Sequence, residues 1–172
     1  MKHILSFLAL ILLTACSTAY LSLPLQSHKT QNFKINGVYY KKYYDNGERF
    51  SAVCFYQNGA YLMNIGSRDS SEFIDKLKNG FYDSLTFIPK YFWGRFVISG
   101  NKIIINRFAP GSPVALFSVI EKGEILNDSA FVITHIQVSD EEKPEQVRQI
   151  YRYLDLPKPK VDSNNAYVLG LK

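Results

Sequence analysis

Two Asn-Gly pairs between aromatic and β-branched segments constrain this fold more than any other feature of the sequence. Asn46-Gly47 follows an aromatic segment at 33–44, and Asn58-Gly59 separates a segment at 49–57 from another at 60–65. Asn and Gly readily adopt the positive φ angles that tight type I′ hairpin turns require. Three consecutive strands joined by two such turns predict an antiparallel meander.

The rest of the chain repeats this pattern of short apolar segments separated by turn residues. Strands are predicted at 91–98 and 102–108, at 114–120 with a turn-rich patch at 121–124 and a short continuation to Leu126, and at 130–138 and 147–156. Phe73, Ile74 and Leu77 recur at helical spacing before Gly80, which predicts one short helix over 69–79. About eight to ten strands at this spacing are typical of all-β barrels and sandwiches. We therefore expect an all-β fold, an antiparallel meander barrel with one short helix.

The amino terminus carries the pattern of a cleaved leader. Lys2 and His3 precede an apolar run of ten residues at Ile4–Leu13, half of the roughly 20 that a membrane-spanning helix needs. The run ends in Leu13-Thr14-Ala15-Cys16, which resembles the lipobox of bacterial lipoproteins. That resemblance implies that residues 1–15 are a signal peptide. It also implies that Cys16 is the first mature residue, with a diacylglyceryl group on its thiol and an acylated amino terminus.

The resemblance to a lipobox also implies a location. Several acyl chains on Cys16 anchor a protein in a lipid bilayer permanently, whereas one chain alone holds it only marginally. In the family pattern an Asp after the cysteine favours the inner membrane, and Ser17 stands there in this chain. We expect a lipid-anchored protein of the bacterial cell envelope, at the outer rather than the inner membrane. The alternative is an ordinary signal peptide that happens to end near a cysteine.

Removal of the leader leaves 157 of the 172 residues, enough for one domain with a hydrophobic core. The sequence predicts three mature parts: a flexible tether at 16–32, a barrel domain at 33–156 and a C-terminal tail at 157–172. His28 in the tether is expected to be solvated, and Tyr167, Val168 and Leu169 in the tail can still dock. The net charge of +5 comes without a dense basic run, so no nucleic-acid partner is expected.

A second resemblance covers most of residues 33–156. It is carried, in order, by Gly37-Val38-Tyr39, by Asn58-Gly59-Ala60-Tyr61, by Trp93–Ile103 and by Gly123–Phe131. These segments resemble those of small lipocalin-like lipoproteins of Bacteroidetes-type bacteria. The resemblance implies a cup-shaped barrel more directly than any activity.

No catalytic or metal-binding pattern stands out in the sequence. The mature chain has two histidines, His28 and His135, and lacks the common zinc, nucleophile and phosphate-binding motifs. A lone histidine such as His135, on a strand face with Phe131, is expected to be a surface or structural residue. Cys54 is expected to be a small buried hydrophobe, since no nearby base or cation would lower its thiol pKa. The sequence predicts neither an enzyme nor a cofactor.

Two functions from different classes are consistent with such a barrel. In the first, an aromatic lumen binds a small apolar molecule, and the lining positions are Tyr39, Phe55, Tyr61, Phe96 and Phe131. An eight-stranded interior either fills with side chains or holds one small ligand. In the second, the lumen is solid and apolar outer strand faces bind another envelope protein. The strand at 53–56 is apolar on both faces, so the helix, the tail or a partner must cover its outer face.

Overall fold

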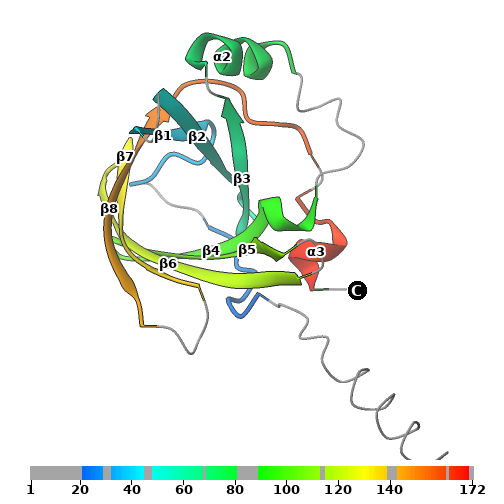
Figure 1. Ribbon diagram of the computed structural model, residues 1–172, viewed down its shortest axis with the longest axis vertical. Helices are drawn as coiled ribbons and strands as arrows, with labels where there is room; N and C mark the ends of the chain where they lie inside the picture. Colours follow the sequence, from blue (N-terminus) through cyan, green and yellow to red (C-terminus); the bar gives the residue numbers. More distant parts are fainter. Residues whose placement is uncertain are drawn as a thin grey trace, which may run out of the picture.

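The described chain folds into a closed antiparallel barrel. The computed structural model describes residues 21–28, 32–44, 48–67, 69–80, 89–112, 115–138, 143–161 and 163–170. Within these residues each of eight strands pairs with its sequence neighbours, and the last pairs back with the first (Figure 1). The strands are β1 (Val38–Tyr44), β2 (Glu48–Phe55), β3 (Ala60–Ser67), β4 (Trp93–Ser99), β5 (Lys102–Ser112), β6 (Ala115–Asn127), β7 (Ala130–Gln137) and β8 (Glu145–Leu154).

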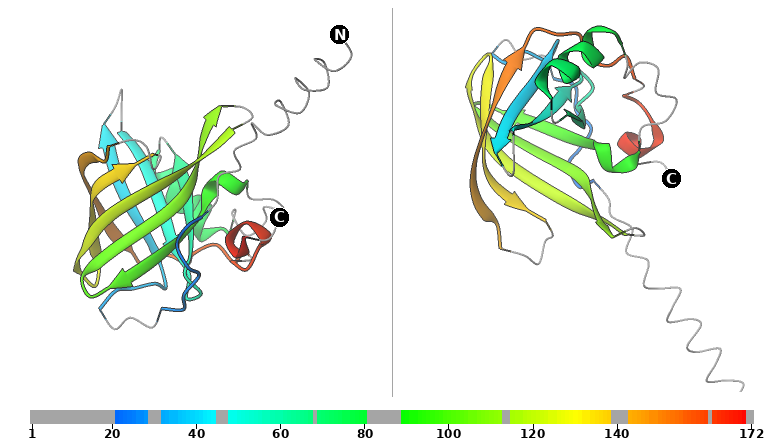
Figure 2. Two further views of the ribbon diagram at one scale, coloured as in Figure 1. Left: turned by 90° about the horizontal axis from the view of Figure 1, so that it is seen from below. Right: turned by 45° about the horizontal axis from the view of Figure 1, so that its top comes forward.

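This architecture confirms the predicted all-β meander barrel. Eight antiparallel strands in sequential order, closed on themselves, form the up-and-down arrangement of lipocalin-like barrels. The strands run obliquely around the barrel, as Figure 2 shows. Closure leaves no sheet edge where β1 and β8 meet at Val38–Tyr40, so the barrel needs no partner strand there.

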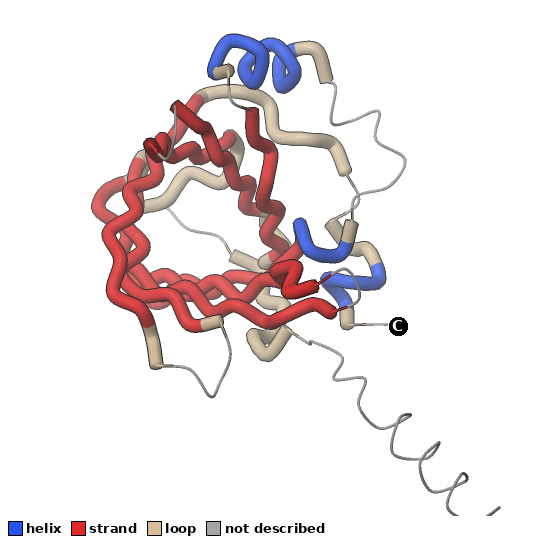
Figure 3. Tube along the Cα trace, in the orientation of Figure 1, coloured by secondary structure: helices blue, strands red, loops and turns tan. Residues whose placement is uncertain are grey.

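The predicted helix is present as α2 (Ser70–Lys78). Asp69 Oδ1 accepts a hydrogen bond from Ser71 N at 2.8 Å, and Gly80 follows with a φ of 64°. The described residues also include a 3-10 turn, η2 (Lys90–Phe92), and a short helix in the tail, α3 (Ala166–Leu169). Both α-helices lie outside the ring of strands (Figure 3). None of the helices described here is long and apolar enough to cross a membrane.

The turn at Asn58-Gly59 differs from the predicted type I′ geometry. Gly59 N donates to Tyr56 O at 2.9 Å and Tyr56 N donates to Ala60 O at 2.9 Å, so three residues form the loop instead of two. Asn58 has a further role, because its amide nitrogen donates to Ser163 O at 3.0 Å and so binds the tail. The other predicted turn, Asn46-Gly47, lies outside the described residues.

The turn predicted at 121–124 is wrong, because β6 runs without interruption through it. Gly123 pairs with Ile133 at a register shift between β6 and β7. A Cβ atom on Gly123 would lie 2.0 Å from the carbonyl oxygen of Val132. The glycine therefore marks a close approach of two strands and not a turn.

Most of the buried hydrophobic side chains form two clusters, one on each face of the barrel wall. The inner cluster fills one half of the lumen and consists of Phe33, Ile35, Tyr39, Val53, Phe55, Tyr61, Phe96, Ile103, Ile105, Phe131, Ile133 and Tyr151. The outer cluster consists of Val38, Ala52, Cys54, Tyr56, Ala60, Leu62, Phe73, Trp93 and Val168. Because Phe73 belongs to α2 and Val168 to α3, the helix and the tail cover the outer face of β2, as the sequence requires. Cys54 is fully buried there, as predicted, and burial raises the pKa of its thiol to about 12.

Residues 21–28 correct the prediction of a flexible tether over 16–32. Arg95 Nη1 donates to Leu23 O at 2.7 Å, and the same side chain donates through Nε to Val168 O at 2.7 Å. His28 is only 5% exposed, and its ring stacks on Phe96 with centroids 4.6 Å apart, so it is not solvated. The prediction failed because most of these contacts use backbone atoms of the segment, which leave no side-chain pattern in the sequence.

Candidate functional site

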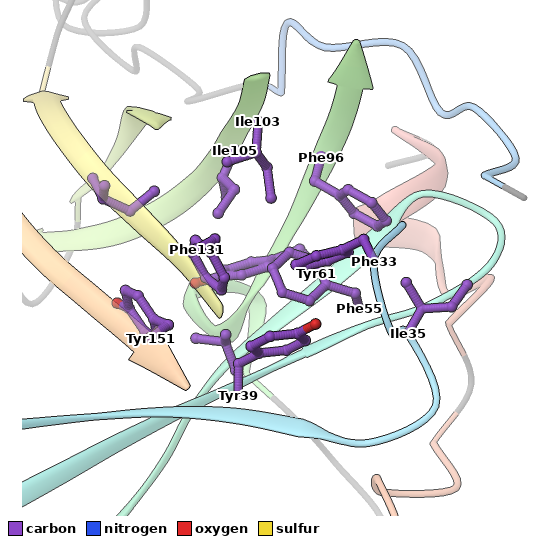
Figure 4. Packing of buried hydrophobic residues seen from close by; sticks show 12 residues of the cluster. Phe33, Ile35, Tyr39, Phe55, Tyr61, Phe96, Ile103, Ile105, Phe131 and Tyr151 are labelled. Atoms are coloured by element: carbon purple, nitrogen blue, oxygen red, sulfur yellow. The ribbon is translucent and has the colours of Figure 1, made fainter. Parts of the chain in front are cut away.

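The five residues predicted to bind a ligand all lie together in the inner cluster. Tyr39, Phe55, Tyr61, Phe96 and Phe131 are each 0% exposed. Phe33, from the segment before β1, inserts its ring among them (Figure 4). Its ring centroid lies 4.8 Å from that of Tyr39, 5.2 Å from that of Phe55 and 5.9 Å from that of Phe131. Protein side chains thus fill this half of the lumen.

The barrel instead has a cavity of about 460 Å³ that is partly open to solvent. None of the five predicted residues lines it. Its walls are Lys41, Lys42, Ser51, Met63, Arg107, Glu121, Ile136, Arg148, Gln149, Ile150 and Tyr151. Strand alternation places it directly beyond the inner cluster, because Lys41 follows Tyr39 by two residues and Arg107 follows Ile105 by two. The inward face of the same strands changes there from aromatic to charged.

The cavity lies where the barrel wall is split between β1 and β8. Pairing between these strands is limited to Val38–Tyr40 opposite Arg152–Leu154. Beyond Tyr40, β1 pairs only with β2, and the preceding part of β8 pairs only with β7. Lys41 and Lys42 line one side of this β1–β8 split, and residues 148–151 line the other. A hydrogen bond from Lys41 Nζ to Gln149 Oε1 spans it.

A buried ion pair forms part of the cavity wall. Arg107 Nε and Nη2 both lie 2.9 Å from the same oxygen, Oε1 of Glu121. The side chains are 14% and 3% exposed. Burial disfavours a charged guanidinium, but the carboxylate outweighs this and holds the pKa of Arg107 above its usual value. Burial also lowers the pKa of Lys41, with Glu121 opposing the shift and Arg107 adding to it.

Two buried oxygens beside this pair have no hydrogen-bond partner among the described residues. One is the second oxygen of Glu121, Oε2, and the other is the hydroxyl of Tyr61. Burial raises the pKa of Tyr61 well above its usual value, so the hydroxyl stays neutral and can donate. Buried polar atoms are nearly always satisfied, so these two oxygens are exceptions; Glu121 belongs to the cavity lining and Tyr61 does not.

Two residues singled out in the sequence lie away from this cavity. His135 is half-buried on β7, where Nδ1 lies 2.9 Å from the Thr134 hydroxyl oxygen. Cys54 faces the outer cluster on the other side of the barrel wall. Across the part of the chain that the structure describes, no group of three or more His, Cys, Asp or Glu side chains can hold a metal ion.

The charged cavity residues were not predicted, although alternation along the strands points to them. Once Tyr39 and Ile105 are assigned to the lumen, Lys41 and Arg107 must share their face. Glu121 stands opposite Ile105 in the β5–β6 register, so it also faces inward. Its position depended on recognising β6 as one continuous strand, which the predicted turn at 121–124 prevented.

Comparisons with known proteins add no family to this picture. No protein-family model matches the chain, and no curated protein and no solved structure matches it. The likeness to lipocalins is therefore one of strand number, order and closure. The cavity and its charges are therefore the basis for a functional proposal.

Proposed function

We propose that this protein is a lipid-anchored lipoprotein of the bacterial cell envelope that binds a small molecule in its barrel. The cavity of about 460 Å³ carries the proposal, because small-molecule sites typically measure about 300–1,000 Å³. The packed aromatic half supports this site as a rigid floor. The ligand then occupies the half with Met63, Ile136 and Ile150, so its apolar part contacts these side chains while a polar part meets the charges.

The outer surface favours this role over that of an accessory protein that binds a partner through apolar strand faces. The outer cluster is already covered by α2 and by the tail. Among the described residues, the large apolar side chains that remain exposed are Phe117, Leu126, Val138 and Leu169. Phe117 and Leu126 lie nine residues apart on β6, Val138 follows β7, and Leu169 is the last residue of α3. Single exposed apolar residues of this kind are normal on a protein surface.

The contacts of residues 21–28 define how close a lipid anchor would hold the barrel. Ser22 N donates to Asn106 Oδ1 at 2.5 Å, so the segment is bound to β5 almost from its first described residue. If Cys16 is acylated, only residues 17–20 separate it from Leu21. Five extended residues reach at most roughly 18 Å. The barrel would therefore stay next to the bilayer surface instead of ranging on a long tether.

Metabolic labelling with palmitate tests the anchor. The wild-type protein should be labelled and sediment with membranes, whereas Cys16→Ser should stay an unlabelled, unprocessed precursor. Cys54→Ala is the matched control, because it removes the other cysteine and should leave labelling intact. Normal labelling of Cys16→Ser would contradict lipidation at this site.

Native mass spectrometry of the protein extracted from its own membrane tests the binding function. A retained small molecule, lost on denaturation, is the expected result. Retention of a polypeptide would support the accessory role instead. Detection of the bare protein, under conditions that preserve a control lipoprotein complex, would count against both functions.

A further inference from the structure

We propose that the end of the barrel that holds the cavity rests on the bilayer, with Phe117 and Val138 in contact with the lipid headgroup layer. This inference rests on the proposed lipid anchor and adds the orientation in which that anchor holds the barrel. The cavity end is the end at which β5 joins β6 and β7 joins β8. The closed end is the opposite one, where β2 joins β3 and β6 joins β7.

The segment at 21–28, which leads from the anchor to the fold, approaches from the cavity end. At its C-terminal end His28 N donates to Gln57 O at 2.8 Å, in the turn between β2 and β3 at the closed end. At its N-terminal end Ser22 N donates to Asn106 Oδ1 at 2.5 Å, in the middle of β5 and next to the cavity residue Arg107. Followed backward from His28 to Ser22, the segment thus runs along the outside of the barrel toward the cavity end (Figure 2).

The remaining linker has the length that this orientation needs. From Asn106 to Ser112 at the cavity end, β5 rises by about 20 Å, or roughly 15 Å along the axis of a barrel whose strands tilt by about 40°. Between Cys16 and Leu21 an extended chain reaches at most roughly 18 Å, so an acylated Cys16 can lie at the level of the cavity end. To place the closed end on the bilayer, the chain would have to reverse within 17–20 and return past 22–28.

The cavity end also carries exposed apolar side chains on the inner face of the wall. Phe117 lies on the same face of β6 as Val119 and the cavity residue Glu121, because side chains alternate along a strand. Val119 is 2% exposed and Phe117 is 46% exposed, so the Phe117 ring stands at the rim. Val138 follows the cavity residue Ile136 by two residues and is 37% exposed. Both side chains therefore extend the cavity wall to its rim.

A bilayer fits this rim better than a protein partner does. Two apolar side chains are too few for a stable protein interface, which buries about 800 Å² on each partner. A bilayer requires less, because the acyl chains on Cys16 supply the affinity and the rim has only to fix the orientation. The described charges near the rim have both signs, since Lys143, Glu145 and Arg148 are all exposed, so the inference needs no anionic lipid.

A fluorescent label at each end of β6 tests the orientation. Phe117→Cys and Leu126→Cys, each combined with Cys54→Ala, are labelled with nitrobenzoxadiazole. The full mature lipoprotein is then placed in phosphatidylcholine vesicles that contain a headgroup nitroxide. The replaced side chains are 46% and 51% exposed, so both variants should fold. Because the two positions lie about 30 Å apart along β6, the nitroxide should quench the label at position 117 at least about twofold more than the label at 126.

Val138→Cys gives a second measurement with Phe117 in place, and its label should also be quenched more than the label at position 126. Palmitate labelling and flotation with the vesicles report on the anchor separately. If the protein carries palmitate and floats, but the label at 126 is quenched as much as those at 117 and 138, the anchor stands and the docking surface is wrong. If the protein carries no palmitate, the lipid anchor fails and the orientation fails with it.

Discussion

Replacement of Phe33 by alanine tests whether the aromatic half of the barrel is a filled core or a ligand site. Phe33 is 3% exposed and belongs to the segment before β1, so its ring closes the inner cluster from outside the strand network. If the ring is a structural plug, its removal should destabilise the fold strongly. If the space normally holds a ligand, the residue is dispensable for folding.

The magnitude follows from burial. Transfer of a phenyl ring from the core to water costs about 2 kcal/mol. The vacated space is on the order of 100 Å³, which at about 24 cal/mol per Å³ adds roughly 2.4 kcal/mol. Phe33→Ala should therefore lower the free energy of unfolding by about 4 kcal/mol, before any loss of its ring contacts with Tyr39 and Phe55.

Urea unfolding followed by tryptophan fluorescence measures this loss. Trp93 is the single tryptophan and is 2% exposed, so its emission reports on global unfolding. With a slope of about 2 kcal/mol per molar urea, the midpoint should fall by roughly 2 M. Phe117→Ala is the matched control: the same atoms are removed from a side chain that is 46% exposed, and the loss should stay below about 1 kcal/mol. Equal midpoints for the two variants would refute the filled core.

The Cys54 thiol should react with a disulfide reagent only after unfolding, because it is fully buried and its pKa is raised to about 12; labelling faster than unfolding would contradict this. Because the pKa of the Cys54 thiol is raised in the fold, the neutral thiol contributes stability below the usual pKa of 9.0, and this contribution should be lost as pH rises toward 12. Cys54→Ala should therefore flatten the fall in unfolding free energy over that pH range. Gly123→Ala should lower the free energy of unfolding by about 3 kcal/mol or more, since the new Cβ would lie 2.0 Å from a carbonyl oxygen of β7. Gly100→Ala, with open space around it, should lower that free energy by about 1 kcal/mol through its positive φ alone. Arg107→Met combined with Glu121→Met should leave the unfolding free energy unchanged or raised; a loss of more than about 3 kcal/mol would show that the pair is structural.

Local signals predicted most of this fold. Strand alternation and the turn residues at Asn58-Gly59 and Ser99-Gly100-Asn101 depend only on nearby sequence, and the structure has a hairpin at each. The capping oxygen of Asp69 and the positive φ of Gly80 likewise delimit α2. What the sequence could not show were tertiary approaches. Gly123 reads as a turn until a neighbouring strand is known to pass within contact distance.

The site was harder to predict than the fold because aromatic residues in a lumen have two opposite uses. The five predicted residues are in the lumen, but Phe33 comes from outside the strands and fills the space between them. Phe33 and Ile35 continue the alternation of Tyr39, but β1 begins only at Val38, so the sequence did not show that the segment before the strand would turn its Phe33 ring into the lumen. Five of the residues that line the cavity are charged, and the sequence alone does not tell whether a charged strand residue faces the lumen or solvent unless the register is known.

The Arg107–Glu121 pair connects the packed half of the barrel to the open half. The inner cluster beneath it excludes water, so both charges are desolvated, and a buried ion pair seldom repays that cost. The geometry makes the cost larger, because both contacts from the guanidinium to Glu121 go to one carboxylate oxygen, and the other oxygen is left without a partner among the described residues. Apolar side chains would fill the same positions at lower cost, as Ile103 and Ile105 do on the same face of β5. Under the proposed binding function, the pair would instead provide fixed charges at the edge of the cavity, where they could orient a polar ligand.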